Sequence, residues 1–452
     1  MLNKLRKRCI YMCGDLGLQT ITNFANIYLM IYLTDILGIS PLAAGTMYAV
    51  ARVWDAINDP LMGSIADRTR TRWGSYRPWF LFGALPLCAV FVLLFTVPNF
   101  SPSGKLVWAY VVYIAYGMLM TMVSIPYGAL PNVLTTDSQE RSILGIFRTY
   151  GSNISQLMVS ALAVPLFTIL GNDPNGNAAG YQGAAFVFAL ITFVLCLIMF
   201  FFSREVIPVP QTKTDFKASF RSFLHNGPAI CLLVICFFNI ANISTRMGLI
   251  PYWTKHYLQN AALQGPFLTF HSTVMLFIPA TVPFLTRFIG KKYTLMLSGT
   301  FAVACGIVTF LAGHNIALCY VAMFLGACAA STCGPVVFGT IPDAADYGEW
   351  KTGVRCPGVI ASGTTFGMKL ASGIGGLFMG IILSLVGYNG DLEVQTAQAQ
   401  QGILLLTTFV PVVFGALVAL TASRFKLDPK TTAQVSRELA ERRAAQLAEE
   451  QN

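Results

Sequence analysis

Long apolar stretches separated by short polar segments follow one another along the whole chain. Most of them reach the roughly 20 residues that an α-helix needs to cross a hydrocarbon core of about 30 Å. They do not alternate apolar and polar residues over segments of about ten, as the strands of a membrane barrel would. The pattern predicts twelve membrane-spanning helices, at residues 14–36, 41–66, 79–97, 105–130, 143–170, 181–202, 228–253, 264–288, 293–312, 316–340, 358–387 and 402–422.

The composition agrees with this pattern and excludes a soluble globular protein of ordinary composition. Hydrophobic residues make up 55% of the 452 residues and charged residues only 11%, against roughly a quarter charged in soluble domains. The mean hydropathy is +0.62. The 11 cysteines are scattered without CxxC pairs or His/Cys metal spacing, which predicts packing roles rather than disulfides or metal ligands. We therefore expect an all-α polytopic membrane protein.

The net charge of +10 is distributed unevenly between the two sides of the predicted membrane. If both termini are cytoplasmic, the inside segments hold 25 of the 30 Lys and Arg residues, whereas the outside segments hold only Lys105 and Lys255. The positive-inside rule therefore places both termini in the cytoplasm. The basic N-terminus runs directly into a span without a small-residue cleavage site, so we expect the first helix to be retained. The charge excess indicates topology rather than nucleic-acid binding.

Two six-helix halves are predicted, joined by the longest polar internal stretch, which has two prolines and mixed charge. The predicted organisation is a first half at 1–202, a cytoplasmic linker at 203–227, a second half at 228–422 and a cytoplasmic tail at 423–452. The turns after the second and eighth spans are both short and basic. The segments after the fourth and tenth spans both open with proline and mix acidic with basic residues. Such repeats are typical of transporters with a substrate cavity between their halves.

Three charged residues lie inside the second apolar stretch, in "ARVWDAINDP". Arg52, Asp55 and Asp59 are spaced i, i+3 and i+7 and therefore share one helix face. A charge at mid-bilayer costs on the order of 3 kcal/mol, so these residues should face the bundle interior and be paired. One Arg and two Asp leave a charge of −1, which favours a coupling cation, either Na⁺ bound by carboxylate oxygens or a proton. An ion pair that only ties helices together is the alternative.

Two further basic residues lie within predicted spans. Lys369 is in a glycine-rich span about ten residues from the cytoplasmic loop, so we predict that it pairs with an aspartate of the second span rather than snorkelling to the interface. Arg246 has no acidic neighbour in the sequence. It can bind an anionic group of the substrate or pair with Asp35 or Asp15 as a gate, and both possibilities stay open. His271 is more typical of a satisfied interior histidine than of a proton relay.

Polar side chains suited to sugar hydroxyls gather on the first and fourth spans. They are Gln19, Thr22, Asn23 and Asn26 on the first span and Thr121, Ser124 and Tyr127 on the fourth. A tyrosine can also stack on the face of a pyranose ring. Hydrogen bonds between helices explain any one of these residues equally well.

The stretches "ARVWDAINDPLMGSIADRTRTRWGSYRPW" and "DAADYGEWKTGVR", together with Lys369, resemble the melibiose permease-like glycoside/pentoside/hexuronide:cation symporters of the major facilitator superfamily. The resemblance covers nearly the whole chain. It implies the major facilitator fold, with 12 transmembrane helices in two pseudo-symmetric six-helix halves and both termini cytoplasmic. It also implies a site for Na⁺, Li⁺ or H⁺ formed by Asp55, Asp59, Asn58 and Thr121, with Lys369 nearby.

Roles for the remaining candidate residues follow from the patterns above and from the resemblance. We expect Lys369 and Arg52 to couple cation and sugar binding. The residues expected to bind the substrate are Gln19, Asn23, Ser124, Tyr127, Arg148, Arg246 and Thr365. The cytoplasmic gate is expected at Asp67 and Arg72 of "DRTRTRWG" and at Asp346 and Glu349 of "DYGEWKTG".

The expected substrate residues depart from those of the family's α-galactoside carriers. Gln19 and Ser124 stand where those carriers have aspartates, and Gly128 stands where they have a stacking tryptophan. With these carboxylates absent and Arg148 and Arg246 present, the cavity is less negative, which favours an anionic sugar such as a hexuronide. The same changes suit a neutral xyloside or another glycoside, so both substrate classes stay open.

We therefore expect a secondary active symporter of the bacterial inner membrane that carries a glycoside, with an anionic hexuronide-like sugar as the candidate substrate, together with Na⁺ or H⁺ by alternating access. A neutral pentoside carrier, or a sugar exchanger or exporter, is the alternative. The sequence has no Walker A motif for ATP-driven transport, and its unlike halves do not favour a channel built from repeated pore elements. We expect no enzymatic activity, no cofactor or metal beyond the coupling ion, and a monomer whose partners are its sugar and the lipid bilayer.

Overall fold

A computed structural model describes most of the chain. The described residues are 2–135, 138–173, 176–205, 221–353, 357–390 and 394–425, together with 392, 427, 431, 434, 435, 437–439 and 441. Most of the predicted linker at 203–227 and of the predicted tail at 423–452 lies outside the described residues.

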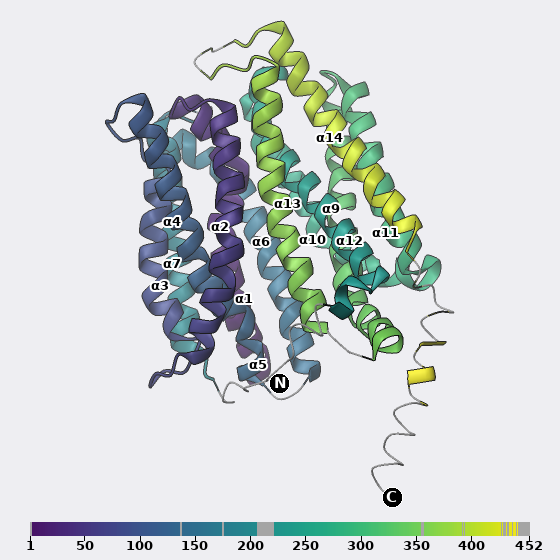
Figure 1. The fold of residues 1–452 in the computed structure, drawn as a ribbon. Helices are drawn as coiled ribbons and strands as arrows, with labels where there is room; N and C mark the ends of the chain where they lie inside the picture. Colours follow the sequence, from purple (N-terminus) through teal and green to yellow (C-terminus); the bar gives the residue numbers. More distant parts are fainter. Residues whose placement is uncertain are drawn as a thin grey trace, which may run out of the picture. The chain divides into compact units, whose positions relative to one another are not determined.

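Long helices form almost all of the described chain (Figure 1). The first are α1 Leu2–Ile31, the π-helical turn η1 Tyr32–Ile36, α2 Pro41–Arg68, α3 Pro78–Leu94, α4 Pro102–Ala129, α5 Pro131–Leu134, α6 Ser138–Gly171 and α7 Ala178–Phe202. They continue with α9 Gly227–Tyr252, η2 Trp253–Tyr257, η3 Ala261–Leu263, α10 Gln264–Phe277, η4 Ile278–Thr281, α11 Val282–Ala312, α12 Ile316–Thr352, α13 Pro357–Leu385 and α14 Ala397–Ser423. The part of the chain described here has no strand beyond an isolated bridge between Thr71 and Gly74. The all-α prediction is confirmed.

Short sequence signals set the starts of several helices. Ser40 and Ser101 cap α2 and α4 by accepting a hydrogen bond from the backbone N–H three residues on, and a proline follows each of them. Asn315 caps α12 in a similar way. A short polar side chain satisfies an N–H that has no partner within the helix, and proline at the first position loses no hydrogen bond. These helices therefore begin at the polar edges of the apolar stretches.

A glycine divides the longest apolar helical stretch. Residues Ala261–Ala312 form a continuous stretch of 52 residues, where the apolar pattern predicts two spans, at 264–288 and 293–312. Gly290, inside α11, has φ 81° and ψ 161°, so it is not helical. Glycine adopts a positive φ without the steric cost that a side chain adds. The break lies between the two predicted spans.

Helix α12 is longer than its predicted span. The apolar pattern predicts an end at residue 340, whereas α12 continues to Thr352 through "PDAADYGEWKT". Gly353 ends it with a left-handed φ of 74°, and its N–H donates to the carbonyl oxygen of Glu349 at 2.8 Å. The acidic residues expected in the cytoplasmic gate, Asp346 and Glu349, therefore lie on the last turns of a helix rather than in a connecting segment.

Contacts divide the chain into two units, each with its own core. Unit 1 comprises residues 1–211, 244–276 and 373–407, and unit 2 comprises residues 212–243, 277–372 and 408–452. The units are defined by contacts, whereas the two halves are inferred from similar segments of the sequence. The halves therefore stay a prediction.

Aromatic side chains form much of the core of unit 1 around α1. Phe24 is fully buried, and its ring centroid lies 4.9 Å from that of Phe95, 5.1 Å from Phe188, 6.1 Å from Phe91 and 6.2 Å from Phe167. Several of these pairs meet edge to face, the arrangement that aromatic quadrupoles favour. Through them α1 packs against α6 and α7 (Figure 1). This packing fixes the position of the polar residues that α1 carries.

Small residues let two helices of unit 2 approach closely. A Cβ added to Gly299 of α11 would lie 2.6 Å from the carbonyl oxygen of Gly415 and 2.7 Å from the backbone nitrogen of Ala419, both on α14. A Cβ added to Gly415 would lie 2.7 Å from the Cβ of Ala302. Helices in membranes use such small residues because lipid supplies no hydrophobic driving force for their association.

We expect Gly299→Leu to destabilise unit 2 by about 1–3 kcal/mol, the usual cost of overpacking, because the new side chain has no room against α14. Gly334→Leu on α12 is the matched control, since a Cβ at Gly334 meets nothing within 4 Å. Thermal unfolding of the detergent-solubilised protein should show a lower Tm for G299L alone. Equal Tm values for the two variants would contradict the close packing of α11 and α14.

Candidate functional site

The charged residues of α2 include a buried ion pair. The carboxylate of Asp55, a residue only 5% exposed, accepts a hydrogen bond from Arg52 Nη1 at 2.7 Å. Arg52 also donates from Nη2 to the Tyr113 hydroxyl of α4 at 3.2 Å. Because Arg52 and Asp55 lie on one helix, their ion pair does not itself join two helices. The connection from α2 to α4 runs through Tyr113.

Asp59, one turn further along α2, accepts a hydrogen bond from a hydroxyl of α4. Thr121 is buried, and its Oγ1 donates to Asp59 Oδ1 at 2.9 Å. The neighbouring Asn58 Nδ2 is buried and has no hydrogen-bond partner among the described residues. Helix α4 can come this close because Gly117 has no side chain: an added Cβ would lie 3.2 Å from Asp55 Oδ1.

These residues place several oxygen atoms on the facing sides of α2 and α4. Two carboxylates, the Asn58 amide and the Thr121 hydroxyl can supply hard oxygen ligands of the kind that Na⁺ requires, and a carboxylate can also carry a proton. The arrangement can therefore bind a cation.

Two expected site residues lie on the part of α13 that belongs to unit 2. Lys369 is partly buried. Thr365 is exposed, and its hydroxyl donates to the carbonyl oxygen of Ala361 on its own helix at 3.0 Å. Asp55 and Asp59 belong to unit 1, so the pairing of Lys369 with either of them stays a prediction.

An ion pair between α1 and α6 lies beside two stacked tyrosines. Asp15 is buried and accepts a hydrogen bond from Arg148 Nε at 3.2 Å. The Arg148 guanidinium lies 5.4 Å from the ring centroid of Tyr127, which stacks on Tyr11 at 4.7 Å. The Tyr127 hydroxyl donates to the Tyr11 carbonyl oxygen at 2.9 Å, and Tyr127 is 1% exposed. In this arrangement Tyr127 supports Arg148 and does not present an open ring face to a sugar.

The polar residues expected to contact the sugar include one that joins two helices. Asn23 Nδ2 donates to Ser155 Oγ of α6 at 3.2 Å, and Thr20 Oγ1 lies 3.3 Å from the same oxygen. The interhelical explanation therefore applies to Asn23. Gln19 and Ser124 are partly buried and stay candidate substrate residues.

The sequence offered a pairing of Arg246 with Asp35 or Asp15 as one possibility. In the described structure, neither aspartate forms its ion pair with Arg246. Asp35, at the end of η1, accepts hydrogen bonds from Lys255 Nζ and from the Tyr388 hydroxyl, each at 2.6 Å. Arg246 is itself buried on α9. The two aspartates pair with Arg148 and Lys255 instead, and the role of Arg246 in substrate binding stays a prediction.

The Asp35 cluster, formed by Asp35, Lys255, His256 and Tyr388, joins segments that are far apart in the sequence. His256 Nε2 lies 2.9 Å from the Tyr388 hydroxyl and 3.4 Å from Asp35 Oδ2. The cluster connects the end of the first span with η2 and with the residues after α13, all within unit 1. Sequence reasoning counted Lys255 only as an outside charge and passed over His256 and Tyr388. One feature of the sequence could have revealed this cluster: Asp35 and Lys255 have opposite charges, and both lie at the outer ends of their predicted spans.

A carboxylate outside the expected gate holds the loop after α2. Glu205 accepts hydrogen bonds from the backbone N–H groups of Ser75, Tyr76 and Arg77 at 2.8–2.9 Å. Gly74 has φ 114°, and a Cβ added there would overlap the Glu205 carboxylate. Successive N–H groups directed at one anion form a charge-assisted site. Sequence reasoning missed Glu205 because it lies in the predicted linker, 128 residues or more from its partners.

Two of the expected gate residues lie on or just after α2. The Arg72 guanidinium lies 4.2 Å from the ring centroid of Trp73, a cation–π contact. Asp67 lies on α2, but its side chain is outside the described residues.

The other two expected gate residues lie near the end of α12 in unit 2. Asp346 and Glu349 are both partly buried. Asp343, one turn earlier on the same helix, accepts a hydrogen bond from Lys291 Nζ at 2.6 Å, and this pair was not predicted. Acidic groups are therefore concentrated at this helix end, as the motif indicated.

Comparisons with known proteins match nearly the whole chain. Residues 10–429 match the family described as MFS/sugar transport protein. The isoprimeverose transporter of Lactiplantibacillus pentosus is 31% identical over 452 residues, covering 98% of this chain and 94% of the relative. The inner membrane symporter YicJ of Escherichia coli (strain K12) is 31% identical over 422 residues, covering 93% and 91%. A solved structure of a bacterial homolog of the human lysosomal transporter Spinster, inward-facing and unoccupied, has a TM-score of 0.69 at 12% identity, covering 93% of this chain and 99% of that one, which concerns the fold alone.

We expect Glu205→Gln and Gly74→Ala each to loosen the loop after α2, because the first weakens a charge-assisted site and the second pushes the carboxylate away. Hydrogen exchange should show the amides of residues 75–77 exchanging about 10-fold faster or more, since hydrogen bonds to charged groups contribute roughly 1.5–3 kcal/mol. Glu441→Gln, which alters an exposed carboxylate of the tail paired with Arg437, is the control. Unchanged protection in both loop variants would show that Glu205 does not hold the loop.

Proposed function

Because the chain belongs to the MFS/sugar transport protein family, we propose that it is a secondary active symporter that carries a neutral glycoside together with Na⁺ or H⁺. The family makes it a transporter rather than an enzyme, and it is a multi-pass protein of the bacterial inner membrane. Relatives named for isoprimeverose transport and for symport support a sugar substrate and an ion-coupled mechanism. The observation that carries the coupling is the acidic pair on α2.

The acidic pair is a suitable place for the coupling ion. Asp55 and Asp59 lie in an apolar span, where charged groups are costly and usually functional. The Thr121 hydroxyl lies beside Asp59, and the adjacent Asn58 can supply an amide oxygen. A bound Na⁺ or proton would offset the negative charge of the two carboxylates. We propose that this offset is what makes sugar binding depend on the cation.

Helix α13 supports the expected coupling role of Lys369. Within unit 1, a Cβ added to Gly373 of α13 would overlap the side chain of Arg52. Lys369 precedes Gly373 by one helical turn. We propose that the Lys369 ammonium responds to the occupancy of the acidic pair.

We propose twelve crossings of the membrane with both termini in the cytoplasm. Among the described residues, eight helical segments are long and apolar enough to cross a membrane, and Ala261–Ala312 would extend about 78 Å as a single helix. The break at Gly290 supports two crossings in that segment. The shorter α3 supports one more, and α1 and α2, whose charged residues lower their hydropathy, support two.

The charges near the proposed sugar site favour a neutral substrate over an anionic one. Arg148 is the basic residue that the resemblance assigns to the sugar cavity, yet its guanidinium is paired with the buried Asp15 and packed on Tyr127. An anionic sugar would have to compete with this carboxylate. Gln19 and Ser124 can offer neutral hydrogen bonds to sugar hydroxyls. A hexuronide stays the alternative. Measuring the affinity for a neutral and for an anionic glycoside distinguishes the two substrate classes.

We propose that the Asp35 cluster is the outer gate of the transporter. It joins the first span, which belongs to the first predicted half, to η2 and Tyr388, which belong to the second. Opening the outer side by rocking the halves apart would have to separate Asp35 from Lys255. Such rearranged ion pairs are a common device of two-state transitions.

We expect Asp55→Asn and Asp59→Asn each to abolish cation-dependent sugar accumulation in vesicles, because each removes a charge that the coupling ion neutralises. Couplings of this kind typically change affinity 5- to 150-fold, and this cation-induced gain in sugar affinity should disappear. Exchange of labelled for unlabelled sugar should persist. Asp173→Asn, in the loop after α6, is the control and should accumulate sugar like the wild type. Full accumulation in both α2 variants would refute the cation site.

We expect Asp15→Asn to change the preference of the sugar site from neutral toward anionic glycosides, because it leaves the Arg148 guanidinium without its carboxylate. Calorimetry against a matched neutral and uronic-acid glycoside should show the affinity ratio moving toward the anion by about 10-fold or more, the usual size of a new charge-assisted hydrogen bond. Asp173→Asn should leave the ratio unchanged. A wild type that prefers the uronic acid would instead favour a hexuronide carrier.

A further inference from the structure

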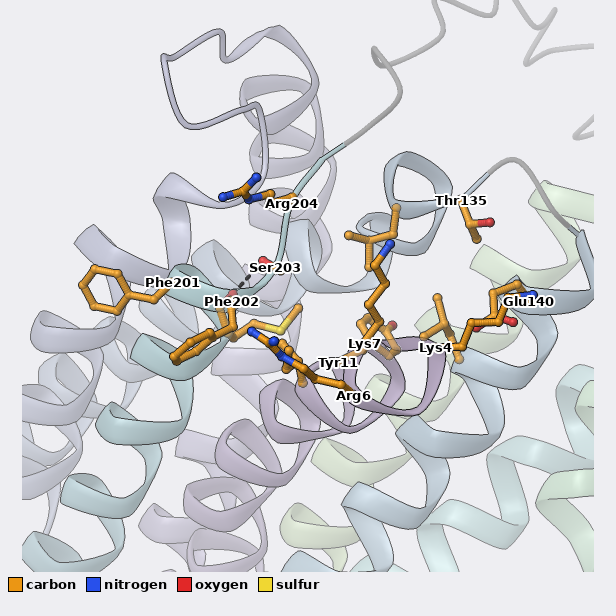
Figure 2. A pocket seen from close by; sticks show the side chains of 14 residues that line it. Lys4, Arg6, Lys7, Tyr11, Thr135, Glu140, Phe201, Phe202, Ser203 and Arg204 are labelled. Carbon is orange, nitrogen blue, oxygen red and sulfur yellow. Dashed lines mark hydrogen bonds between the residues drawn. The ribbon is translucent and has the colours of Figure 1, made fainter. Parts of the chain in front are cut away.

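A concave site lies at one end of unit 1, and none of the expected sugar or cation residues lines it. Figure 2 shows the side chains that line it. It is a cavity of about 680 Å³, within the range of ligand-binding pockets. Its lining residues lie on the first turns of α1, at the end of α5 with Thr135 after it, on the first turns of α6, and at the end of α7 with the residues that follow it. Because the positive-inside rule places the N-terminus in the cytoplasm, this end of unit 1 is the cytoplasmic one.

The lining of this cavity is strongly positive. Lys4, Arg6, Lys7 and Arg204 line it, and Glu140 is the acidic residue among them. The Glu140 carboxylate already binds Arg8, which donates from Nε at 2.8 Å and from Nη2 at 2.7 Å. This hydrogen bonding lowers the pKa of Glu140, so its carboxylate stays ionised and paired.

With Glu140 neutralised by Arg8, four cations remain around one cavity. In the described structure they have no acidic partner in the cavity other than Glu140. Positive groups gathered in a recess attract an anion with several oxygens, and a phosphate is the anion that Lys and Arg bind best together. Basic pockets at the cytoplasmic ends of membrane helices are typical sites for anionic lipid headgroups.

Aromatic rings beside the charges indicate that the anion carries an apolar part. Phe201 and Phe202, the last residues of α7, are 62% and 55% exposed and line the same cavity. The Arg6 guanidinium lies 5.8 Å from the centroid of the Phe202 ring. The site therefore lies where an apolar helix end meets a basic segment, which matches the boundary between acyl chains and headgroups.

We propose that this cavity binds the phosphate headgroup of an anionic phospholipid of the cytoplasmic leaflet, such as phosphatidylglycerol. Lys4, Arg6 and Lys7 from α1 and Arg204 after α7 contact the phosphate, and an acyl chain lies against Phe201 and Phe202. Free phosphate or a soluble phosphate ester shares the headgroup chemistry but cannot use the exposed rings. The bound lipid ties the start of α1 to the end of α7 and so stabilises the helix that carries Asp15 and Gln19.

The test compares the full-length protein with two triple variants of equal charge change. Lys4→Gln/Arg6→Gln/Lys7→Gln empties the cavity of three cations. Arg221→Gln/Arg287→Gln/Arg437→Gln removes three cations from exposed positions outside it. A third variant, Lys4→Arg/Arg6→Lys/Lys7→Arg, keeps the charge and serves as a control for correct folding. Each delipidated protein is titrated with phosphatidylglycerol, phosphatidylcholine or inorganic phosphate and followed by native mass spectrometry and by Tm.

We expect the wild type, the exposed-site triple and the charge-conserving triple to bind phosphatidylglycerol in preference to phosphatidylcholine and to gain Tm from it. The cavity triple should lose about 100-fold in affinity for phosphatidylglycerol, the product of a roughly fivefold contribution from each cation. An undiminished preference in the cavity triple, or an equal loss in the exposed-site triple, would overturn the proposal. Stabilisation by inorganic phosphate with no further gain from phosphatidylglycerol would also overturn it, in favour of a soluble anion.

Discussion

Charged groups inside a membrane require partners, and this requirement organises the polar interior of the protein. Three aspartates of the first two spans have buried side chains, and each accepts a hydrogen bond from a basic residue. The pairs are Asp15 with Arg148, Asp35 with Lys255 and Asp55 with Arg52. A carboxylate in the hydrocarbon region costs several kcal/mol unless it is compensated. The Asp15–Arg148 and Asp35–Lys255 pairs therefore constrain which segments can lie side by side, whereas the Asp55–Arg52 pair stays within α2.

The three pairs differ in which segments they join, and this difference fits the proposed transport mechanism. The Asp55–Arg52 pair lies within one helix, so an arriving cation can compete for Asp55 without first separating two helices. The Asp35–Lys255 pair joins the two predicted halves, so it must break when the outer side opens. If a cation and a sugar are bound in one conformation only, each must raise the affinity for the other by the same factor. In the proposed mechanism, the pair that senses the ion is therefore separate from the pair that closes the outer gate.

Glycines determine where these charged helices can meet. Along α13, a Cβ added to Gly376 would press on Tyr48 of α2, and one added to Gly380 would overlap the backbone at Pro41 and Gly45. The glycine-rich sequence of α13 is therefore explained by close approach to α2, which carries the acidic pair. Helices in contact through backbone rather than through long side chains interlock little, so they can shift against each other with little repacking.

The class of fold, the approximate position of each long helix and the charged face of α2 follow from the amino-acid sequence alone. These are local properties: a hydrocarbon layer demands about 20 apolar residues in a row, and spacing along one helix decides which side chains share a face. Only the tertiary structure decided which groups are partners. Thr121 and Asp59 are 62 residues apart, Asp15 and Arg148 are 133 apart, and Asp35 and Lys255 are 220 apart. An apolar helix face can pack against many neighbours, so these pairs follow from the three-dimensional packing and not from the hydrophobic pattern.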